Sequence, residues 1–504
     1  LSNPLVRPVW FIPVLGRQLR SFAALAGATA EAAEVGATAA ASGRQALETA
    51  AGGGPERARA LRELSAIAER AEEDLADLDL GPGEHLVPSL ARNRRDLVGY
   101  LGEGRTTLRR VGLVTGAVAD VLAGPSRYLL LASNNAEMRA GSGMFLSAGI
   151  IEARDGSLTL GPMRPTGDLT LPGTGVEGDP DLQARWGWLH PGREWRNLGL
   201  SPRFDATGEL AAAMWQALGG DPVDGVLAID VETLRALLSA TGPVPVGDGV
   251  VGPDEVVELL LHGQYLELAE VGTPELADQA GRRERLGELA GAALGALETG
   301  DYDPGTLVAE LAGAAGGRHL LAWSAQPDHQ QAWEAAGISG SLSEESLLVS
   351  VLNRGGNKLD RFLQVGSSLA LRPVSAGTDV AVEVHLANRT PVGEPWYVAG
   401  PAPGSGLAPG DYLGMVSANV PAAAADLRID GEPVLMARGP DGPTQVIAAP
   451  VLVPAGSART VVIRFRLPPE VGSVDVEPSA RIPPIEWSAG DTEWRGDVAR
   501  TVAW

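Results

Sequence analysis

The spacing of apolar residues changes twice along the chain, and this change limits the possible folds more than any single motif. From about residue 14 to residue 122, apolar residues recur at alternating intervals of three and four, the period of packed helices. From Ser126 onward, short aliphatic runs alternate with helical segments, which is typical of a layered α/β domain. From about residue 370, period-two runs separated by Pro and Gly turns predict a β-sandwich.

These changes divide the sequence into segments of different architecture. We expect the Trp- and Pro-rich tail to pack on the other domains, because exposed tryptophans are costly. The predicted segments are a helical bundle or long hairpin (1–122), an α/β core domain (123–340), a connecting strand or loop (341–370), a β-sandwich (371–468) and the tail (469–504).

Charge and cysteine content exclude several classes of function. The 504 residues carry a net charge of −23 and include no cysteine. A negative field of this size repels nucleic acid, so we expect no nucleic-acid partner. Disulfides and Cys-ligated iron–sulfur clusters are excluded, and the segment NRGGNK lacks the spacing of a nucleotide-binding Walker loop. We expect no nucleotide, haem or iron–sulfur cluster.

A dense polar cluster follows the first predicted strand of the α/β domain. The strand RYLLLA leads into SNNAEMRAGSGMF, which contains Asn134, Asn135, Glu137 and Arg139. Ligands of α/β sheets bind at the carboxyl ends of strands. There, Arg139 could bind a phosphate or carboxylate, and the carboxylate and amides could hold a cation or sugar hydroxyls. The alternative is that the Asn side chains cap the turn and Glu137 pairs with Arg139.

Basic residues recur in two further segments. HPGREWRNLGLSPRFD contains Arg193, Arg196 and Arg203, which form either a local anion site or the solvated charges of a loop. In NRGGNKLDRFL, backbone N–H groups and Lys358 could bind an anion, although an interdomain ion pair explains the lysine equally well.

Two aspartates flank the predicted strand in VDGVLAIDVETLRALLSATGPV. Asp230 precedes a helical pattern and has the position of a helix N-cap rather than of a catalyst. Asp224 stands before Gly225, where it can form a turn. The histidines show no i, i+4 pair, so the sequence predicts no His-based metal site.

Several of these segments together resemble an uncharacterised bacterial family, domain-of-unknown-function family 4012, which is common in actinobacteria. The resemblance is carried by RYLLLASNNAEMRAGSGMF, the Ser-Pro-Arg-Phe-Asp stretch, PVDGVLAIDVETLRALLSATGPV, LLLHGQY and NKLDRFL. Members usually have a transmembrane helix ahead of a segment like LVRPVWFIPVLGRQLRSF. The resemblance therefore implies an extracytoplasmic protein of the cell envelope, with a membrane anchor outside these 504 residues.

The segment VDGVLAIDVETLRALLSATGPVPV is also similar to part of the LytR-CpsA-Psr phosphotransferases. These enzymes transfer glycopolymers from polyprenyl pyrophosphate carriers to peptidoglycan, using arginines, aspartates and a divalent cation. The similarity implies a LytR-CpsA-Psr-like α/β fold, with Arg139 and Glu137 in the places of an arginine and its acidic neighbour. The Arg-Asp pair of that family corresponds to Arg164 and Asp168, which are separated here.

Three hypotheses follow. The first is an envelope protein that binds a phosphate-bearing or glycan ligand, such as a cell-wall glycan or polyprenyl-linked glycopolymer, and that could transfer it with Mg²⁺. The second is a non-catalytic scaffold that binds polysaccharide or protein, and the third is a glycoside hydrolase pairing Glu137 with Asp205 or Asp224. For the first, the expected residues are catalytic Glu137, Arg139 and Arg196, ligand-binding Asn134, Asn135, Arg164, Arg203 and Lys358, and metal-binding Glu137 and Asp168.

Overall fold

The computed structural model of the chain divides into two compact units. We call Leu1–Pro125 with Arg154–Ser157 the helical unit, and Ser126–Ala153 with Leu158–Trp504 the main unit. Within the described residues, no helix combines the length and apolarity needed to cross a membrane. The structure describes residues 13–247, 249–266, 275–300, 302–431 and 435–504.

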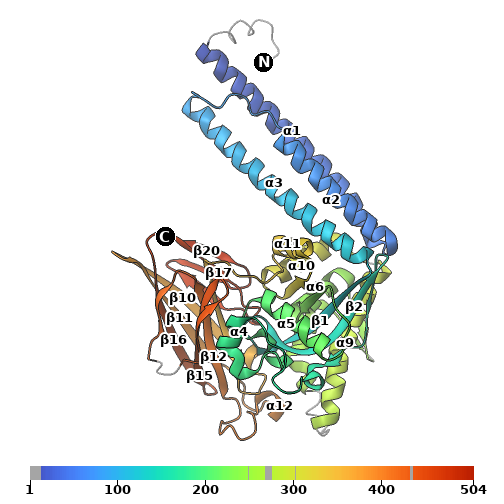
Figure 1. Cartoon of the computed structure of the whole chain (residues 1–504), viewed down its shortest axis with the longest axis vertical. Helices are drawn as coiled ribbons and strands as arrows, with labels where there is room; N and C mark the ends of the chain where they lie inside the picture. The colour runs from blue at the N-terminus through green and yellow to red at the C-terminus, as the bar shows by residue number, and fades with distance from the viewer. Residues whose placement is uncertain (1–12, 248, 267–274, 301, 432–434) are drawn as a thin grey trace. The chain divides into compact units, whose positions relative to one another are not determined.

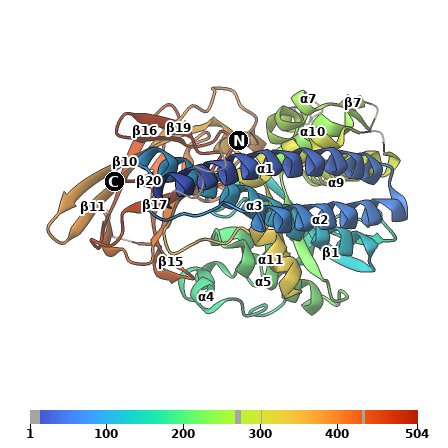
Figure 2. The same cartoon turned by 90° about the horizontal axis from the view of Figure 1, so that it is seen from above.

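From residue 13 onward, the helical unit consists of three long helices that lie side by side (Figures 1 and 2). They are α1 (Pro13–Ala51), α2 (Gly54–Ala76) and α3 (Pro88–Ala123). Proline lies in the first turn of both α2 and α3, where its missing N–H has no helical partner to lose. In α2, the apolar residues Leu64, Ala68, Ala71 and Leu75, which recur at intervals of three and four, are buried. The prediction of an N-terminal helical region is confirmed.

The main unit begins with a mixed sheet of order β3-β2-β1-β5-β8, with β4 paired to β2. Strand β1 runs parallel to β5 and antiparallel to β2. The strands are β1 (Ser126–Met138), β2 (Gly143–Arg154), β3 (Ser157–Leu160), β4 (Arg164–Pro165), β5 (Gly225–Ile229) and β8 (Leu320–Ser324).

Alternate residues of β1 enter cores on opposite faces of this sheet. Leu129 and Leu131 pack with residues of α4 and α5, whereas Leu130 packs with residues of α6, α7 and α9. Figure 2 shows α4 and α5 on one side and α7 and α9 on the other. The layered α/β prediction is therefore confirmed. The helices are α4 (Pro180–Trp186), α5 (Phe204–Ala217), α6 (Val231–Thr241), α7 (Pro253–Glu258), α9 (Glu275–Thr299), α10 (Pro304–Gly316) and α11 (Pro327–Ala336), with a hairpin of β6 (Val244–Val246) and β7 (Gly249–Val251).

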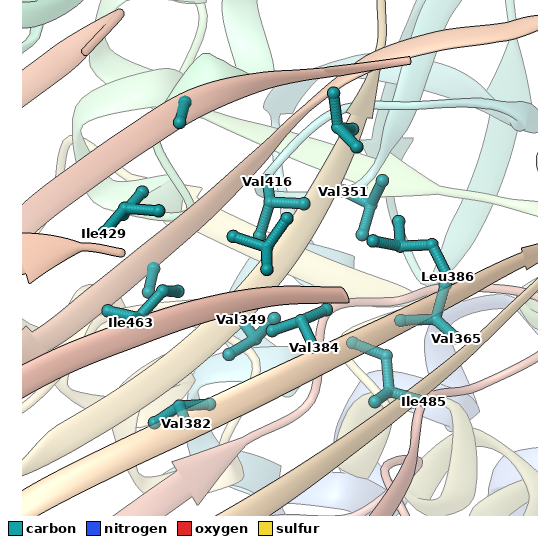
Figure 3. Close-up of a cluster of buried hydrophobic side chains, with 14 of the residues drawn as sticks. Val349, Val351, Val365, Val382, Val384, Leu386, Val416, Ile429, Ile463 and Ile485 are labelled. Carbon is teal, nitrogen blue, oxygen red and sulfur yellow. The ribbon is translucent and has the colours of Figure 1, made fainter. Parts of the chain in front are cut away.

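The rest of the main unit is rich in strands, which form two sheets. The first has the order β14-β15-β12-β9-β17-β20 and the second has the order β13-β16-β11-β10-β18-β19. Valine, leucine and isoleucine side chains from both sheets form one core, shown in Figure 3. The strands are β9 (Ser346–Asn353), β10 (Leu363–Val374), β11 (Gly377–Asn388), β12 (Tyr412–Pro421), β13 (Ala425–Ile429), β14 (Ala437–Asp441), β15 (Thr444–Val453), β16 (Ala458–Leu467), β17 (Ser473–Glu477), β18 (Glu486–Ala489), β19 (Thr492–Arg495) and β20 (Arg500–Ala503).

The segments on either side of the expected sandwich belong to its sheets. The expected connection, 341–370, contains β9 and the first part of β10, and the expected tail contains β17 to β20. Strand β17 pairs with β9 and β18 pairs with β10, both in parallel. Trp487 is buried and stacks on Trp494, with the ring centroids 5.9 Å apart. The difference arises because periodicity identifies a strand but does not identify its partner.

The central strands β9, β12 and β15 of the sheet that begins with β14 are buried on both faces. Val349 and Val416 point into the core between the sheets, whereas Leu352, Met415 and Val446 pack with the α/β core that contains Leu129. The α/β region and the strand-rich region therefore share a continuous apolar interface within the main unit, and this interface brings the end of β1 against the end of β9.

Candidate functional site

A pocket of about 660 Å³ lies where the end of β1 faces the strand-rich region. Its walls come from β1 and β2, the 3₁₀ helix η4 (Trp195–Leu200), the π-helical turn η5 (Leu259–Gly263), the loop after β9 and the short helix α12 (Trp396–Ala399). The pocket thus gathers segments from the whole main unit around the polar cluster identified in the sequence.

The cluster departs from regular pairing because β1 and β2 shift register between Asn134 and Met138. Such irregularities redirect side chains and are frequent beside functional sites. Gly143 permits the close approach of the two strands, since a Cβ there would lie 2.4 Å from the carbonyl carbon of Asn134. Glycine at position 143 is therefore needed to form the turn that closes the cluster.

The two asparagines serve different contacts. The Asn134 side chain accepts a hydrogen bond from Ala136 N at 2.9 Å and donates to the Tyr265 hydroxyl at 2.8 Å, so the predicted turn-capping role is confirmed. Asn135 donates to Asp230 Oδ2 at 2.7 Å and to the carbonyl oxygen of Ala480 at 2.8 Å. Asn134 lines the pocket, whereas Asn135 does not.

Glu137 forms a buried ion pair with Lys358 at the floor of the pocket, with Oε2 and Nζ 2.9 Å apart. The ammonium also lies 4.5 Å from the ring centroid of Tyr397. Burial opposes ionisation of both partners. Even so, the attraction between them lowers the pKa of Glu137 and raises the pKa of Lys358. Lys358 therefore forms an ion pair with a segment far away in the sequence but within the main unit, and Glu137 pairs with it rather than with Arg139, the alternative considered from the sequence.

Arg139 is used mainly to join main-chain segments. Its Nε donates to the carbonyl oxygen of Arg196 at 2.9 Å, and its Nη1 donates to those of Met138 and Asn353 at 3.0 and 3.1 Å. Burial lowers the pKa of Arg139 to about 10, against the opposing effect of Glu137, so the guanidinium remains charged at neutral pH. It lines the pocket but is held by the protein itself.

Below the floor, Asp360 connects β1 to the strand-rich region. Its carboxylate accepts hydrogen bonds from Met138 N at 3.0 Å, Asn353 Nδ2 at 2.9 Å and the Tyr412 hydroxyl at 2.9 Å. It also pairs with Arg481, whose Nη1 lies 2.7 Å away, and both side chains are almost fully buried. The segment NKLDRFL therefore fixes the floor through its aspartate as well as through its lysine.

Arg196 and Arg354 differ from Lys358 at the floor because, among the described residues, no carboxylate pairs with them. Both line the pocket; Arg196 is exposed and Arg354 is half-buried. Within the part of the chain that the structure describes, neither guanidinium forms an ion pair. Arg354 lies 6.0 Å from the ring centroid of Trp188, and burial lowers its pKa. These two side chains leave net positive charge on the wall.

Three other predicted site residues lie outside this pocket. Arg164 and Asp168 are exposed and do not line it. Arg203 is bonded to Asp179 and Asp205 at 3.3 and 3.1 Å. The structure therefore does not bring Asp168 to the pocket that Glu137 lines, and the pair does not fit a shared Mg²⁺ ion. Among the described residues, no group of three His, Asp or Glu side chains is suited to hold a metal ion.

The remaining candidate carboxylates have structural partners. Asp230 caps α6 by accepting from Glu232 N at 2.9 Å, as predicted, and its other oxygen lies 2.6 Å from Nδ1 of His319. Asp224 accepts from Arg127 N at 2.8 Å. Neither aspartate lines the pocket, and Asp205 does not line it either.

Sequence reasoning missed Arg354, Gln264 and Trp396, which all line the pocket. Arg354 precedes the Gly-Gly pair of NRGGNK, and Gln264 belongs to LLLHGQY. Both residues therefore lie within motifs that were already identified in the sequence. Trp396 follows a Pro-rich loop in a segment that carried no motif.

Comparison with known proteins gives one family match. Residues 123–265 match the model of a family described as "Protein of unknown function (DUF4012)". No curated protein matches the chain. The matched segment includes the polar cluster at the end of β1, η4 and the π-helical turn, and therefore most of the α/β side of the pocket. Residues 123–265 of the chain are therefore similar to the DUF4012 family of proteins of unknown function.

Proposed function

We propose that this protein is an extracytoplasmic protein of the cell envelope that binds a phosphate-bearing or glycan ligand in the pocket of the main unit. The observation that carries the binding proposal is the pair of pocket arginines, Arg196 and Arg354, which form no ion pair within the described residues. The envelope location is supported by the resemblance of the sequence to a family whose members usually carry a transmembrane helix ahead of the corresponding segment.

The charge distribution favours an anionic group at the arginine wall. Glu137 neutralises Lys358 at the floor, so this pair adds little net charge. Guanidinium groups bind phosphate and carboxylate through paired N–H donors, and they are less strongly hydrated than ammonium groups. The chain has a net charge of −23, so most of its surface repels anions. A locally positive pocket is therefore the place where an anion binds.

Binding is better supported than group transfer. Glu137 is held by Lys358 and its pKa lies below the ordinary value, so it is a weak proton acceptor. Arg139 already donates to three main-chain carbonyls. Catalytic roles for Glu137, Arg139 and Arg196, and a LytR-CpsA-Psr-like transfer reaction, remain predictions from the sequence.

Isothermal titration of the full chain with inorganic pyrophosphate at low ionic strength tests the proposal. We expect saturable binding that is weakened at least about tenfold in Arg196→Ala/Arg354→Ala, because two charge-assisted contacts are removed. The matched control is Arg428→Ala/Arg459→Ala, which removes the same charge from exposed residues outside the pocket. Equal affinity in both double variants, or no saturable binding by the unmodified chain, would contradict the proposal.

A further inference from the structure

The pocket is lined by a buried hydrogen-bond acceptor that has no donor among the described residues. Gln264 is only 5% exposed, and its Nε2 donates to the carbonyl oxygen of Leu260 at 2.5 Å. Its Oε1 is buried and, within the described residues, accepts no hydrogen bond. An acceptor in this state costs free energy unless something supplies a donor.

The π-helical turn explains how Gln264 reaches this arrangement. The backbone N–H of Gln264 bonds to the carbonyl of Leu259, five residues earlier, instead of the usual fourth residue. The carbonyl of Leu260 is thereby released to accept from the side-chain amide. The bond to Leu260 also decides which end of the amide is nitrogen, and so leaves the oxygen as the unsatisfied atom.

An aromatic side chain is presented at another wall of the same pocket. Trp396 is 60% exposed, although Val398 and Ala399 in the same helix are buried. Lys358 N donates to the carbonyl of Val398 at 2.9 Å, which anchors the helix to the floor. The indole lies against Gly400, where a Cβ would approach a Trp396 ring carbon to 2.6 Å. The ring is therefore held in place while much of its surface remains accessible.

A ligand that satisfies these contacts needs a hydrogen-bond donor for Gln264 and an apolar surface for Trp396, in addition to negative charge. Inorganic phosphate presents mainly acceptors to the arginines and has no apolar surface for an indole. A saccharide supplies hydroxyl donors for Gln264 and the carboxylate of Glu194, and its ring presents C–H groups that pack on an aromatic face. Resting on the proposed anion-binding function, we propose that the pocket binds a phosphorylated saccharide. Its phosphate lies at Arg196 and Arg354, a hydroxyl donates to Gln264, and the sugar ring packs on Trp396.

The test compares ligands that contain each part of this chemistry. The full chain is titrated with inorganic phosphate, with glucose, galactose and mannose, with the 1-phosphates of these hexoses, and with adenosine monophosphate. We expect at least one hexose 1-phosphate to bind about tenfold or more tightly than inorganic phosphate and than its own free hexose, because two sets of contacts act together.

Two variants separate the sugar contacts from the phosphate contacts. Trp396→Ala and Gln264→Met should each remove most of the advantage of the hexose 1-phosphate and leave inorganic phosphate binding unchanged. Methionine keeps the unbranched shape of glutamine but provides no amide oxygen. The matched control is Val392→Ser, a fully exposed apolar residue of the same inter-strand segment that does not line the pocket. It should leave both affinities unchanged.

Each contrary outcome identifies what has failed. If hexose 1-phosphates bind no more tightly than inorganic phosphate, and both depend on the arginines, the saccharide inference is overturned while anion binding stands. If adenosine monophosphate binds most tightly and its advantage is lost in Trp396→Ala, the indole stacks a base, and the saccharide inference is overturned. If no phosphate compound binds, the anion-binding function fails as well.

Discussion

The floor and the wall of the pocket both contain cationic side chains, but they use them differently. At the floor, Lys358 is paired with Glu137, and Arg139 donates to three main-chain carbonyls. On the wall, Arg196 and Arg354 have no carboxylate partner within the described residues. Charges satisfied by the protein stabilise the fold, whereas charges left facing a cavity can bind a ligand. The densest polar cluster in the sequence therefore mostly forms the support of the site.

The largest loss of stability is expected when Arg481, which pairs with Asp360 below the pocket floor, is replaced. Arg481→Met should lower the free energy of unfolding by about 3–5 kcal/mol, because it leaves the buried Asp360 carboxylate without its cation. Chemical denaturation measures this change. Arg500→Met, at an exposed position, is the control and should have little effect. A loss as small as that of the control would show that Asp360 does not depend on Arg481.

The floor pair itself should give the next largest effect. Lys358→Met should cost about 2–4 kcal/mol of unfolding free energy, since Glu137 is then buried without a partner. The double variant Lys358→Met/Glu137→Leu should recover most of this loss, because two apolar side chains replace the pair. If the double variant is as unstable as the single one, the loss comes from packing rather than from the unpaired carboxylate.

Lowering the pH should reduce the free energy of unfolding of the unmodified chain, because it protonates Glu137 at the pocket floor. The pKa of Glu137 lies below its ordinary value of 4.5, so the folded state binds this proton less readily than the unfolded chain. The stabilisation from Glu137 is therefore present above pH 4.5 and is lost as the pH falls through the pKa of the folded protein. Unfolding free energies of the unmodified chain and Glu137→Gln, measured from pH 6 downward, should converge. A difference that stays constant with pH would contradict the pairing.

The smallest effect on stability is expected at the wall. Arg196→Ala/Arg354→Ala should change the free energy of unfolding by no more than about 0.5 kcal/mol per residue, because neither side chain has an ion pair to lose. The same variant should lose pyrophosphate affinity. Thermal denaturation beside the titration separates the two properties. A destabilisation as large as that of Lys358→Met would mean that the wall arginines, like the floor residues, serve the fold.

Local signals in the sequence predicted much of the fold. Helical structure was expected from about residue 14 to residue 122, and the helices observed there begin at Pro13 and end at Ala123. The Asp230 cap and the strand before it were also expected, and both are observed. These features depend on residues within one or two turns of each other, so a single sequence contains their causes. The parallel pairing of β17 with β9 has no such local cause.

The roles of the site residues could not be predicted because they are decided by contacts between distant segments. Arg354 and Lys358 are four positions apart in NRGGNK, yet Lys358 pairs with a carboxylate 221 positions earlier in the chain. Arg354 has no such partner among the described residues. The sequence motifs indicate that both Arg354 and Lys358 lie near a site. They do not show which of these two side chains has a carboxylate partner.

The central claim is that the wall arginines, rather than the floor cluster, hold an anion. Anomalous diffraction from crystals of the full chain soaked in selenate, a heavy analogue of tetrahedral oxyanions, tests it most directly. The account predicts a selenium peak in the pocket against Arg196 or Arg354, absent from crystals of Arg196→Ala/Arg354→Ala. A pocket without a peak, while selenate occupies surface arginines such as Arg459, would contradict it.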